Sequence, residues 1–222
     1  FSQSDNNFIA NATSNFNTFA GIVLSRSDSN TVLNTTLNSN AYGVEVTSTV
    51  GTGSFNNLVK GNIMNNNTRS IFVVVSSANS FIENKVNNNN IGIFIESSAD
   101  NIFANQTING SSNFSIFGRY DSGTVGARGL NNTFSGITLQ NSNPSNIEFN
   151  YGAASRFNGT IIEDSIIANY TFNATGSVVT FKQRGFGEIN FFGDIGINGT
   201  GDNLTREVRI SNNSAFVSPT LN

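Results

Sequence analysis

The sequence predicts an all-β protein built as a single-stranded parallel β-helix, in which one chain coils through short strands around one core. Composition is the first observation: about half of the 222 residues are Asn, Ser, Thr or Gly, yet only 11% are charged and only two are Pro. Disordered chains carry more charge and more Pro, so a folded protein is expected. Asn, Ser, Thr and Gly are also poor helix formers, which argues against a helical bundle.

Internal repetition is the second observation. Six nine-residue segments align without gaps at start-to-start spacings of 23, 27, 23, 21 and 31 residues. They begin at Asn7, Asn30, Asn57, Ser80, Asn101 and Asn132. A repeat of this length without a helix can bury its apolar side chains only by stacking on copies of itself.

Four positions of the repeat carry structural predictions. The first is Asn in five of the six segments, and stacked Asn side chains can form a hydrogen-bonded ladder. The fifth is Asn or Gly, types that tolerate the left-handed backbone of a corner, at Asn11, Asn34, Gly61, Asn84, Asn105 and Gly136. The third is expected to form one buried stack of Ile9, Val32, Val59, Ile82, Phe103 and Phe134. The seventh is expected to form another, from Thr13, Thr36, Ile63, Val86, Thr107 and Thr138.

A second half-motif follows each nine-residue segment, and its alternation predicts a further short strand. It occurs at Gly21-Ile22-Val23-Leu24, Gly43-Val44-Glu45-Val46, Ser70-Ile71-Phe72-Val73, Gly92-Ile93-Phe94-Ile95 and, more loosely, Asn146-Ile147-Glu148-Phe149. Each repeat therefore contains three short strands.

These strands predict about seven to nine coils of 21–31 residues, stacked about 4.8 Å apart. Residues 1–175 form the regular coils, and residues 176–222 form degenerate final coils and a β cap of the same domain. Leucine-rich repeats have a similar period, but the eight Leu of this chain are too few for that fold. Residues 47–54 and 118–129 lengthen two coils, and such insertions are either binding loops or tolerated surface loops.

The charge balance excludes several functions. The chain has no Cys and no His, which removes disulfides, thiol and imidazole catalysis and the usual zinc sites. A net charge of -3 argues against a nucleic-acid partner. No run approaches the roughly 20 apolar residues of a membrane-spanning helix, so no transmembrane segment is expected.

These motifs resemble the right-handed parallel β-helix repeat of the pectate-lyase-like superfamily, over roughly residues 5–175. They most closely resemble its NosD-like, periplasmic copper-binding group, as found in large secreted archaeal surface proteins. The resemblance implies the right-handed coil. Copper would need His, Met or Cys donors, and Met64 is the only such residue, so no copper site is predicted.

Enzymes with this fold use clustered carboxylates, and the resemblance therefore directs attention to the acids. Glu45 and Glu148 occupy equivalent positions, but four coils, roughly 19 Å, separate them. Glu163 and Asp164 are adjacent, so in a strand they face opposite sides. We expect solvated surface carboxylates and no catalytic residue.

Lyases of this fold bind calcium through carboxylates, beside a basic Arg or Lys. Asp100, Asp121, Arg119 and Arg128 are the candidates near the second inserted loop. Two Asp do not define a calcium site, because calcium takes six to eight oxygen ligands. No metal and no cofactor is predicted.

Thirteen Asn-x-Ser/Thr sequons occur, ten of them after residue 100, where 19 of the 40 Asn lie. This distribution predicts an extracellular glycoprotein, although an Asn-rich chain also forms sequons by chance. The predicted glycosylation sites are Asn66, Asn109, Asn113, Asn131, Asn158, Asn169, Asn173, Asn198, Asn203 and Asn212. Asn11, Asn34 and Asn105 also carry sequons, but they fall at the corner position and are interpreted as structural.

The second half-motif also predicts an interface. If Ile22, Val44, Ile71 and Ile93 face inward, their neighbours in the strands face outward. The outward residues include Val23, Phe72, Val74 and Phe94, which would form an exposed apolar stripe. Soluble monomers rarely leave such a stripe in water, so either the loop at 47–54 or another chain should cover it.

The sequence thus predicts a non-enzymatic extracellular or cell-surface repeat protein, acting as a stalk, an adhesin or a building block of a surface assembly. Its expected partners are other copies of itself, other surface proteins or glycans. The alternative is a carbohydrate-active enzyme or polysaccharide-binding module. Carboxylates and aromatic residues grouped in one cleft would favour that alternative.

Overall fold

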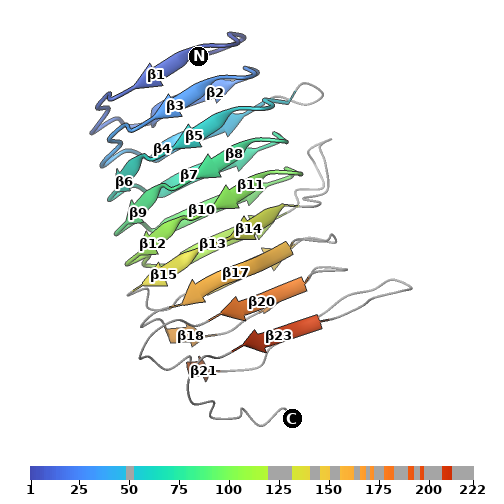
Figure 1. Ribbon diagram of the computed structural model, residues 1–222. Coiled ribbons are helices and arrows are strands. Elements are labelled where there is room, and N and C mark those ends of the chain that lie inside the picture. Colours follow the sequence, from blue (N-terminus) through green and yellow to red (C-terminus); the bar gives the residue numbers. More distant parts are fainter. Residues whose placement is uncertain are drawn as a thin grey trace.

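The computed structural model describes residues 1–48, 53–119 and 132–138 with their side chains, and beyond these the backbone of separate strands. It confirms the parallel β-helix: the strand pairs are parallel and stack as successive layers (Figure 1). No helix occurs among the residues that the structure describes. The part described with side chains has about five turns, fewer than the predicted seven to nine coils, and parallel strand pairs continue beyond it.

The chain runs through three sheets, named here A, B and C. Sheet A contains the longer strands, β2 (Ala20–Ser25), β4 (Tyr42–Thr47), β7 (Arg69–Val74), β10 (Ile91–Glu96), β13 (Phe114–Arg119), β16 (Asn146–Asn150), β19 (Thr171–Phe172) and β22 (Gly196–Ile197). Sheet B contains β1 (Phe8–Ala10), β3 (Thr31–Leu33), β5 (Leu58–Lys60), β8 (Ser80–Ile82), β11 (Ile102–Ala104), β14 (Thr133–Ser135), β17 (Arg156–Ile162), β20 (Val178–Lys182) and β23 (Glu207–Ser211).

Sheet C contains β6 (Ile63–Asn65), β9 (Lys85–Asn87), β12 (Thr107–Asn109) and β15 (Thr138–Gln140). Strand β17 pairs with both β14 and β15 and so joins sheets B and C. A further pair is formed by β18 (Ile166–Ala168) and β21 (Asn190–Phe192). Strands β20 and β23 continue sheet B, but the predicted C-terminal cap lies largely outside the described residues, and the division at residue 175 stays a prediction.

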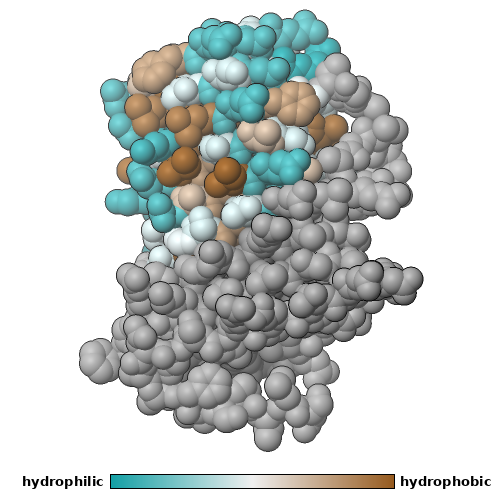
Figure 2. All heavy atoms as spheres, turned by 45° about the vertical axis from the view of Figure 1, so that its right-hand side comes forward, coloured by the Kyte–Doolittle hydropathy of each residue, from teal (hydrophilic) through white to brown (hydrophobic). Residues whose placement is uncertain are grey.

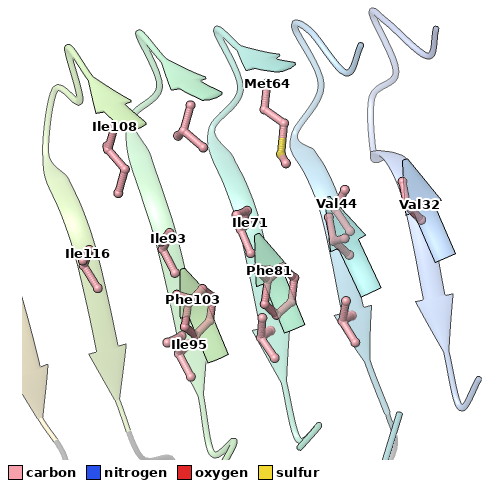
Figure 3. Packing of buried hydrophobic residues seen from close by; sticks show 14 of the residues in the cluster. Val32, Val44, Met64, Ile71, Phe81, Ile93, Ile95, Phe103, Ile108 and Ile116 are labelled. Carbon is pink, nitrogen blue, oxygen red and sulfur yellow. The ribbon is translucent and has the colours of Figure 1, made fainter. Parts of the chain in front are cut away.

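The core consists of four stacks of apolar side chains, one above another along the coil axis (Figure 3). Sheet A supplies two, formed by Ile22, Val44, Ile71, Ile93 and Ile116 and by Leu24, Val46, Val73 and Ile95. Sheet B supplies Val32, Val59, Phe81, Phe103 and Phe134, and sheet C with its preceding turn supplies Leu37, Met64, Val86 and Ile108. The rings of Phe81 and Phe103 are parallel with centroids 4.8 Å apart. This stacking is the predicted source of stability for a chain without disulfides.

Two details of the predicted stacks are wrong. The fourth repeat begins at Asn79, not Ser80, so Phe81 and not Ile82 pairs with Val59 and Phe103 in the core. The second stack uses the eighth position of the repeat, not the seventh. Of its predicted members Val86 does lie in the core, whereas Thr13 and Ile63 are exposed. The left-handed corner at the fifth position shifts the in-and-out alternation by one residue, which places position eight inside.

The predicted Asn ladder is confirmed at the first position, where it includes Asn79. Each Asn Oδ1 accepts hydrogen bonds from the backbone N–H and the Nδ2 of the Asn one coil earlier, at 2.8–3.1 Å. The ladder runs through Asn7, Asn30, Asn57, Asn79, Asn101 and Asn132. It satisfies backbone donors that would otherwise be buried unpaired at a bend of the coil.

Three further ladders mark the other bends. One consists of Thr35, Asn62 and Asn84, a second of Asn17, Asn40, Asn67 and Asn89, and a third of Ser27, Ser54, Ser76 and Ser98. The predicted left-handed corner is confirmed at Asn11, Asn34, Gly61, Asn105 and Gly136. In the fourth repeat the corner residue is Glu83, with φ 56°, while Asn84 belongs to a ladder.

Candidate ligand-binding face

The outward face of sheet A gathers most of the chemistry in the described part of the chain. Its central row follows the strand register through Val23, Glu45, Phe72, Phe94 and Phe117. Tyr42, Arg69, Ile91 and Phe114 form the row on one side, and Thr47, Val74, Glu96 and Arg119 form the row on the other. We call these three rows the aromatic face.

The rings of this face touch from coil to coil. Phe19 contacts Tyr42 with centroids 5.4 Å apart, and Tyr42 contacts Phe72 at 4.8 Å. The chain of contacts continues from Phe72 to Phe94 at 5.0 Å and from Phe94 to Phe117 at 5.1 Å. Tilted and edge-on contacts at these distances are favourable aromatic geometries.

Sequence reasoning missed one strand of this face. Strand β13 brings Ile116 into the core and Phe117 into the aromatic row, in register with Ile93 and Phe94. The signal was present, because Ile116-Phe117 repeats the Ile-Phe pair of the two preceding coils. Ser115 precedes the pair as Ser70 does in β7, but Gly118 stands where the preceding coils have Val73 and Ile95, so the second apolar residue of the half-motif is missing.

The predicted exposed stripe is wrong for its two rings. Phe72 is 8% exposed and Phe94 is 2% exposed within the single chain, and together with Ile91 they form a small second hydrophobic cluster. Val23 and Val74 are half-buried. A partner chain is therefore not needed to shield Phe72 and Phe94 from water.

Arg69 is part of the cover over these rings. Its guanidinium carbon lies 4.6 Å from the Phe72 centroid and 4.4 Å from the Phe94 centroid, and 5.5 Å from that of Tyr42. Arg119 approaches Phe94 at 5.4 Å. Cations over ring faces are attracted by the ring quadrupole, so the two Arg residues bind the surface of the cluster.

The large exposed apolar side chains of the described residues lie outside the three rows, mainly in the first coil, and one of them, Phe19, contacts the aromatic face. They are Phe1, Phe8, Phe16, Phe19, Phe55, Ile63 and Ile102. Figure 2 shows one face of the molecule, on which hydrophobic residues lie scattered among hydrophilic ones. Single exposed apolar residues of this kind are normal on soluble proteins.

The two carboxylates of the aromatic face have different surroundings. Glu96 accepts from Arg119, with 2.7 Å to the terminal nitrogen and 2.9 Å to Nε. Glu45 is 7% exposed, and its Oε2 is buried without a hydrogen-bond partner. Burial raises the pKa of the Glu45 carboxyl, and the positive charge of Arg69 opposes part of that rise. The prediction that Glu45 is a solvated surface carboxylate is wrong.

The strand register separates these two acids. Glu45 and Glu96 belong to strands two coils apart and to different rows, a separation of about 10 Å or more from the strand spacing. A retaining glycosidase needs carboxyl groups about 5 Å apart, and an inverting one about 6.5–9.5 Å apart. The register confirms that Glu148 stands four coils below Glu45 in the same row.

The other predicted candidates do not assemble into a site in the described part. Met64 is fully buried in the core, and Asp100 is exposed. Asp121, Arg128, Glu163 and Asp164 lie outside the described residues, as do residues 49–52 and 120–131 of the two insertions. Within the ranges that the structure describes, no three His, Cys, Asp or Glu side chains are grouped as metal ligands. The same residues contain no helix long and apolar enough to cross a membrane.

A family model described as periplasmic copper-binding protein (NosD) matches residues 1–135. The chain belongs to the NosD family. Comparison with curated proteins and with solved structures gave no match. The family model confirms the resemblance inferred from the repeats, and its description as periplasmic agrees with a location outside the cytoplasm.

The donors that copper prefers are missing from this NosD-family chain. Copper binds imidazole and soft sulfur ligands, and the sequence has no His and no Cys. Its single Met, Met64, packs inside the coil, where a Cβ on Gly43 would lie 3.1 Å from the sulfur. The residues present therefore do not fit a copper site.

Proposed function

We propose that this chain is a non-catalytic structural repeat protein outside the cytoplasm, which serves as a rigid stalk or building block of a cell-surface or envelope assembly. The observation that carries the proposal is the set of four side-chain ladders. They bond each described coil to the next at its bends, in addition to the backbone pairing. Hydrogen bonding between successive coils suits a rigid rod that transmits force or keeps two attached structures a fixed distance apart.

The repeat makes this proposal testable, because each coil contacts mainly its neighbours. Deleting residues 79–100 would join the third coil to the fifth and restore the ladder from Asn57 to Asn101, since Asn79 pairs with both. The rod should fold and shorten by about 4.8 Å. Deleting residues 79–89 is the matched control, since it removes half a coil and breaks the register.

A structural role predicts that cells lacking the protein have a weakened envelope. Expressing the variant without residues 79–100 in those cells should restore envelope strength. The half-coil deletion should not restore it. Purified protein should leave a panel of neutral and acidic polysaccharides uncleaved. Cleavage, or an intact envelope in cells without the protein, would contradict the proposal.

Polysaccharide binding is the second candidate, and the aromatic face favours it. Phe19 is 55% exposed, Tyr42 is half-buried with the Arg69 guanidinium over its ring, and Arg69 also interacts electrostatically with the Glu45 carboxyl. Sugar rings can stack on exposed aromatic side chains, and buried polar groups can fix their orientation. The face groups aromatic rings with carboxylates, as the alternative interpretation required, on the surface of a sheet rather than in a cleft.

Calorimetric titration of the whole protein with oligosaccharides tests this second candidate. Tyr42→Ala should weaken binding about tenfold, a loss of about 1.4 kcal/mol. Lys85→Ala is the control, because Lys85 is exposed on sheet C, away from the aromatic face. Equal binding by both variants would remove the aromatic face as the site.

A further inference from the structure

The described coils contain six sequons, and the structure places them in three different surroundings. Recognition of Asn-x-Ser/Thr involves the hydroxyl residue as well as the Asn. A glycosyltransferase that acts on the folded chain must therefore reach two side chains. The exposure of both separates the six sites, which begin at Asn11, Asn34, Asn66, Asn105, Asn109 and Asn113.

Two sequons are closed in the folded state. Asn109 is half-buried in β12, and its hydroxyl residue Ser111 is 1% exposed. Asn113 is exposed, but its hydroxyl residue Ser115 is fully buried. An enzyme cannot reach these hydroxyls without unfolding the coil.

Two other sequons are partly closed by the next coil. Asn34 and Asn105 are exposed corner residues, but their Oδ1 atoms lie against Gly61 and Gly136. A Cβ on Gly61 would come within 2.5 Å of the Asn34 Oδ1. Their hydroxyl residues, Thr36 and Thr107, are half-buried. Both amides are thus held against the backbone of the neighbouring coil.

Asn11 and Asn66 are the open sequons. Both are exposed, with φ 53° and 56°, and their hydroxyl residues Thr13 and Thr68 are also exposed. Neither side chain hydrogen-bonds to another residue in the part of the chain described. The positions below them are Asn34 and Asn88, not Gly, so no groove receives their amides.

We propose that Asn11 and Asn66 are N-glycosylation sites of the folded protein, and that Asn109 and Asn113 are not. This keeps the sequence prediction for Asn66 and replaces three others: Asn109 and Asn113 were predicted as sites, and Asn11 was interpreted as a structural corner. The donor is a glycan whose anomeric carbon is activated by a phosphate leaving group. The Asn Nδ2 forms a bond to that carbon, the bond from carbon to phosphate oxygen breaks, and the amide loses one proton while the phosphate leaves with the electron pair. The inference rests on the proposed location outside the cytoplasm, and not on the structural role.

Site-resolved mass spectrometry of the native protein tests this assignment. Enzymatic removal of N-glycans in heavy-oxygen water converts each occupied Asn to labelled Asp. Most molecules should carry the label at Asn11 and Asn66, with none at Asn109 and Asn113. Unlabelled Asn11 and Asn66, or equal labelling of Asn109 and Asn113, would overturn it.

A variant pair separates glycosylation from folding. Thr68→Ala removes the Asn66 sequon, and Thr68→Ser keeps it; the exposed Thr68 side chain makes both changes compatible with the fold. The first should lose the Asn66 glycan and the second should retain it, with identical circular dichroism. A glycan still attached to Asn66 in Thr68→Ala would contradict the assignment. The envelope strength of the cells tests the structural role separately.

Discussion

The two faces of sheet A differ in chemistry more than in burial. The inward rows are aliphatic in the described coils except at Gly118 of β13, whereas the outward central row is Val, Glu and then three Phe. Yet Phe94 on the outside is 2% exposed and Ile93 on the inside is 0% exposed. Burial in this solenoid therefore arises outside the coil as well as inside it, from stacked neighbours and from Arg side chains laid across them.

Truncating a side chain should lower the free energy of unfolding by different amounts on the two faces. The inside is enclosed by four stacks and cannot collapse without moving backbone. The outside is bounded by Tyr42, Arg69 and Arg119, whose side chains can shift and admit water. Neighbouring residues of β10 that face opposite ways allow a direct test.

Ile93→Ala should have the largest effect. It removes a fully buried side chain from the middle of a stack and leaves a cavity, which should lower the free energy of unfolding by about 4 kcal/mol. Urea unfolding followed by circular dichroism measures it. A loss below about 1 kcal/mol would mean that the inner stacks are loosely packed.

Phe94→Ala should cost less, although Phe is the larger side chain. The free energy of unfolding should fall by about 2 kcal/mol, the cost of transferring the ring to water. No cavity cost is added, because water and the Arg69 side chain can fill the space. The same unfolding experiment gives the value. A loss greater than that of Ile93→Ala would show that the aromatic face is as rigid as the core.

Most of the fold could be predicted, because the same pattern of Asn, Gly and apolar residues recurs in each coil. The Asn ladder, the left-handed corners and the inward residues of sheet A follow from spacing alone. The fourth repeat was misplaced because Glu83, an unusual residue for positive φ, occupies the corner, and aligning Asn84 there shifted the start to Ser80. The preference of Asn for a left-handed corner therefore located the fourth repeat less reliably than the Asn ladder would have done.

The aromatic face could be predicted only as a row. The alternation places Phe72 and Phe94 outside, which the structure confirms, but their burial depends on Arg69 reaching across two coils. The environment of Glu45 depends on the same contacts between side chains distant in sequence. Periodicity states which way a side chain points, and not what covers it.

Arg69→Met should have a smaller effect than either truncation. Met keeps an apolar stem over the rings and removes the cation, so about 1 kcal/mol of stability should be lost. Lys85→Met is the control, a change of an exposed cation on sheet C. Equal stability of Arg69→Met and the control would show that the cation contributes nothing to the cover.

Glu45→Gln should produce the smallest effect, visible as a change in pH dependence. Because the folded-state pKa of Glu45 is raised, the folded protein holds its proton more tightly than the unfolded chain does. The stability from this carboxyl is therefore complete below its ordinary pKa of 4.5 and falls as pH rises through the raised value. Gln keeps the shape without the charge, so the variant should gain on the natural protein as pH rises above 4.5 and then hold a constant advantage. Urea midpoints across this range, with Glu83→Gln as the exposed carboxylate control, measure the difference. An advantage that instead grows toward low pH would mean that the Glu45 carboxylate is stabilised in its ionised form, and that Arg69 outweighs the burial.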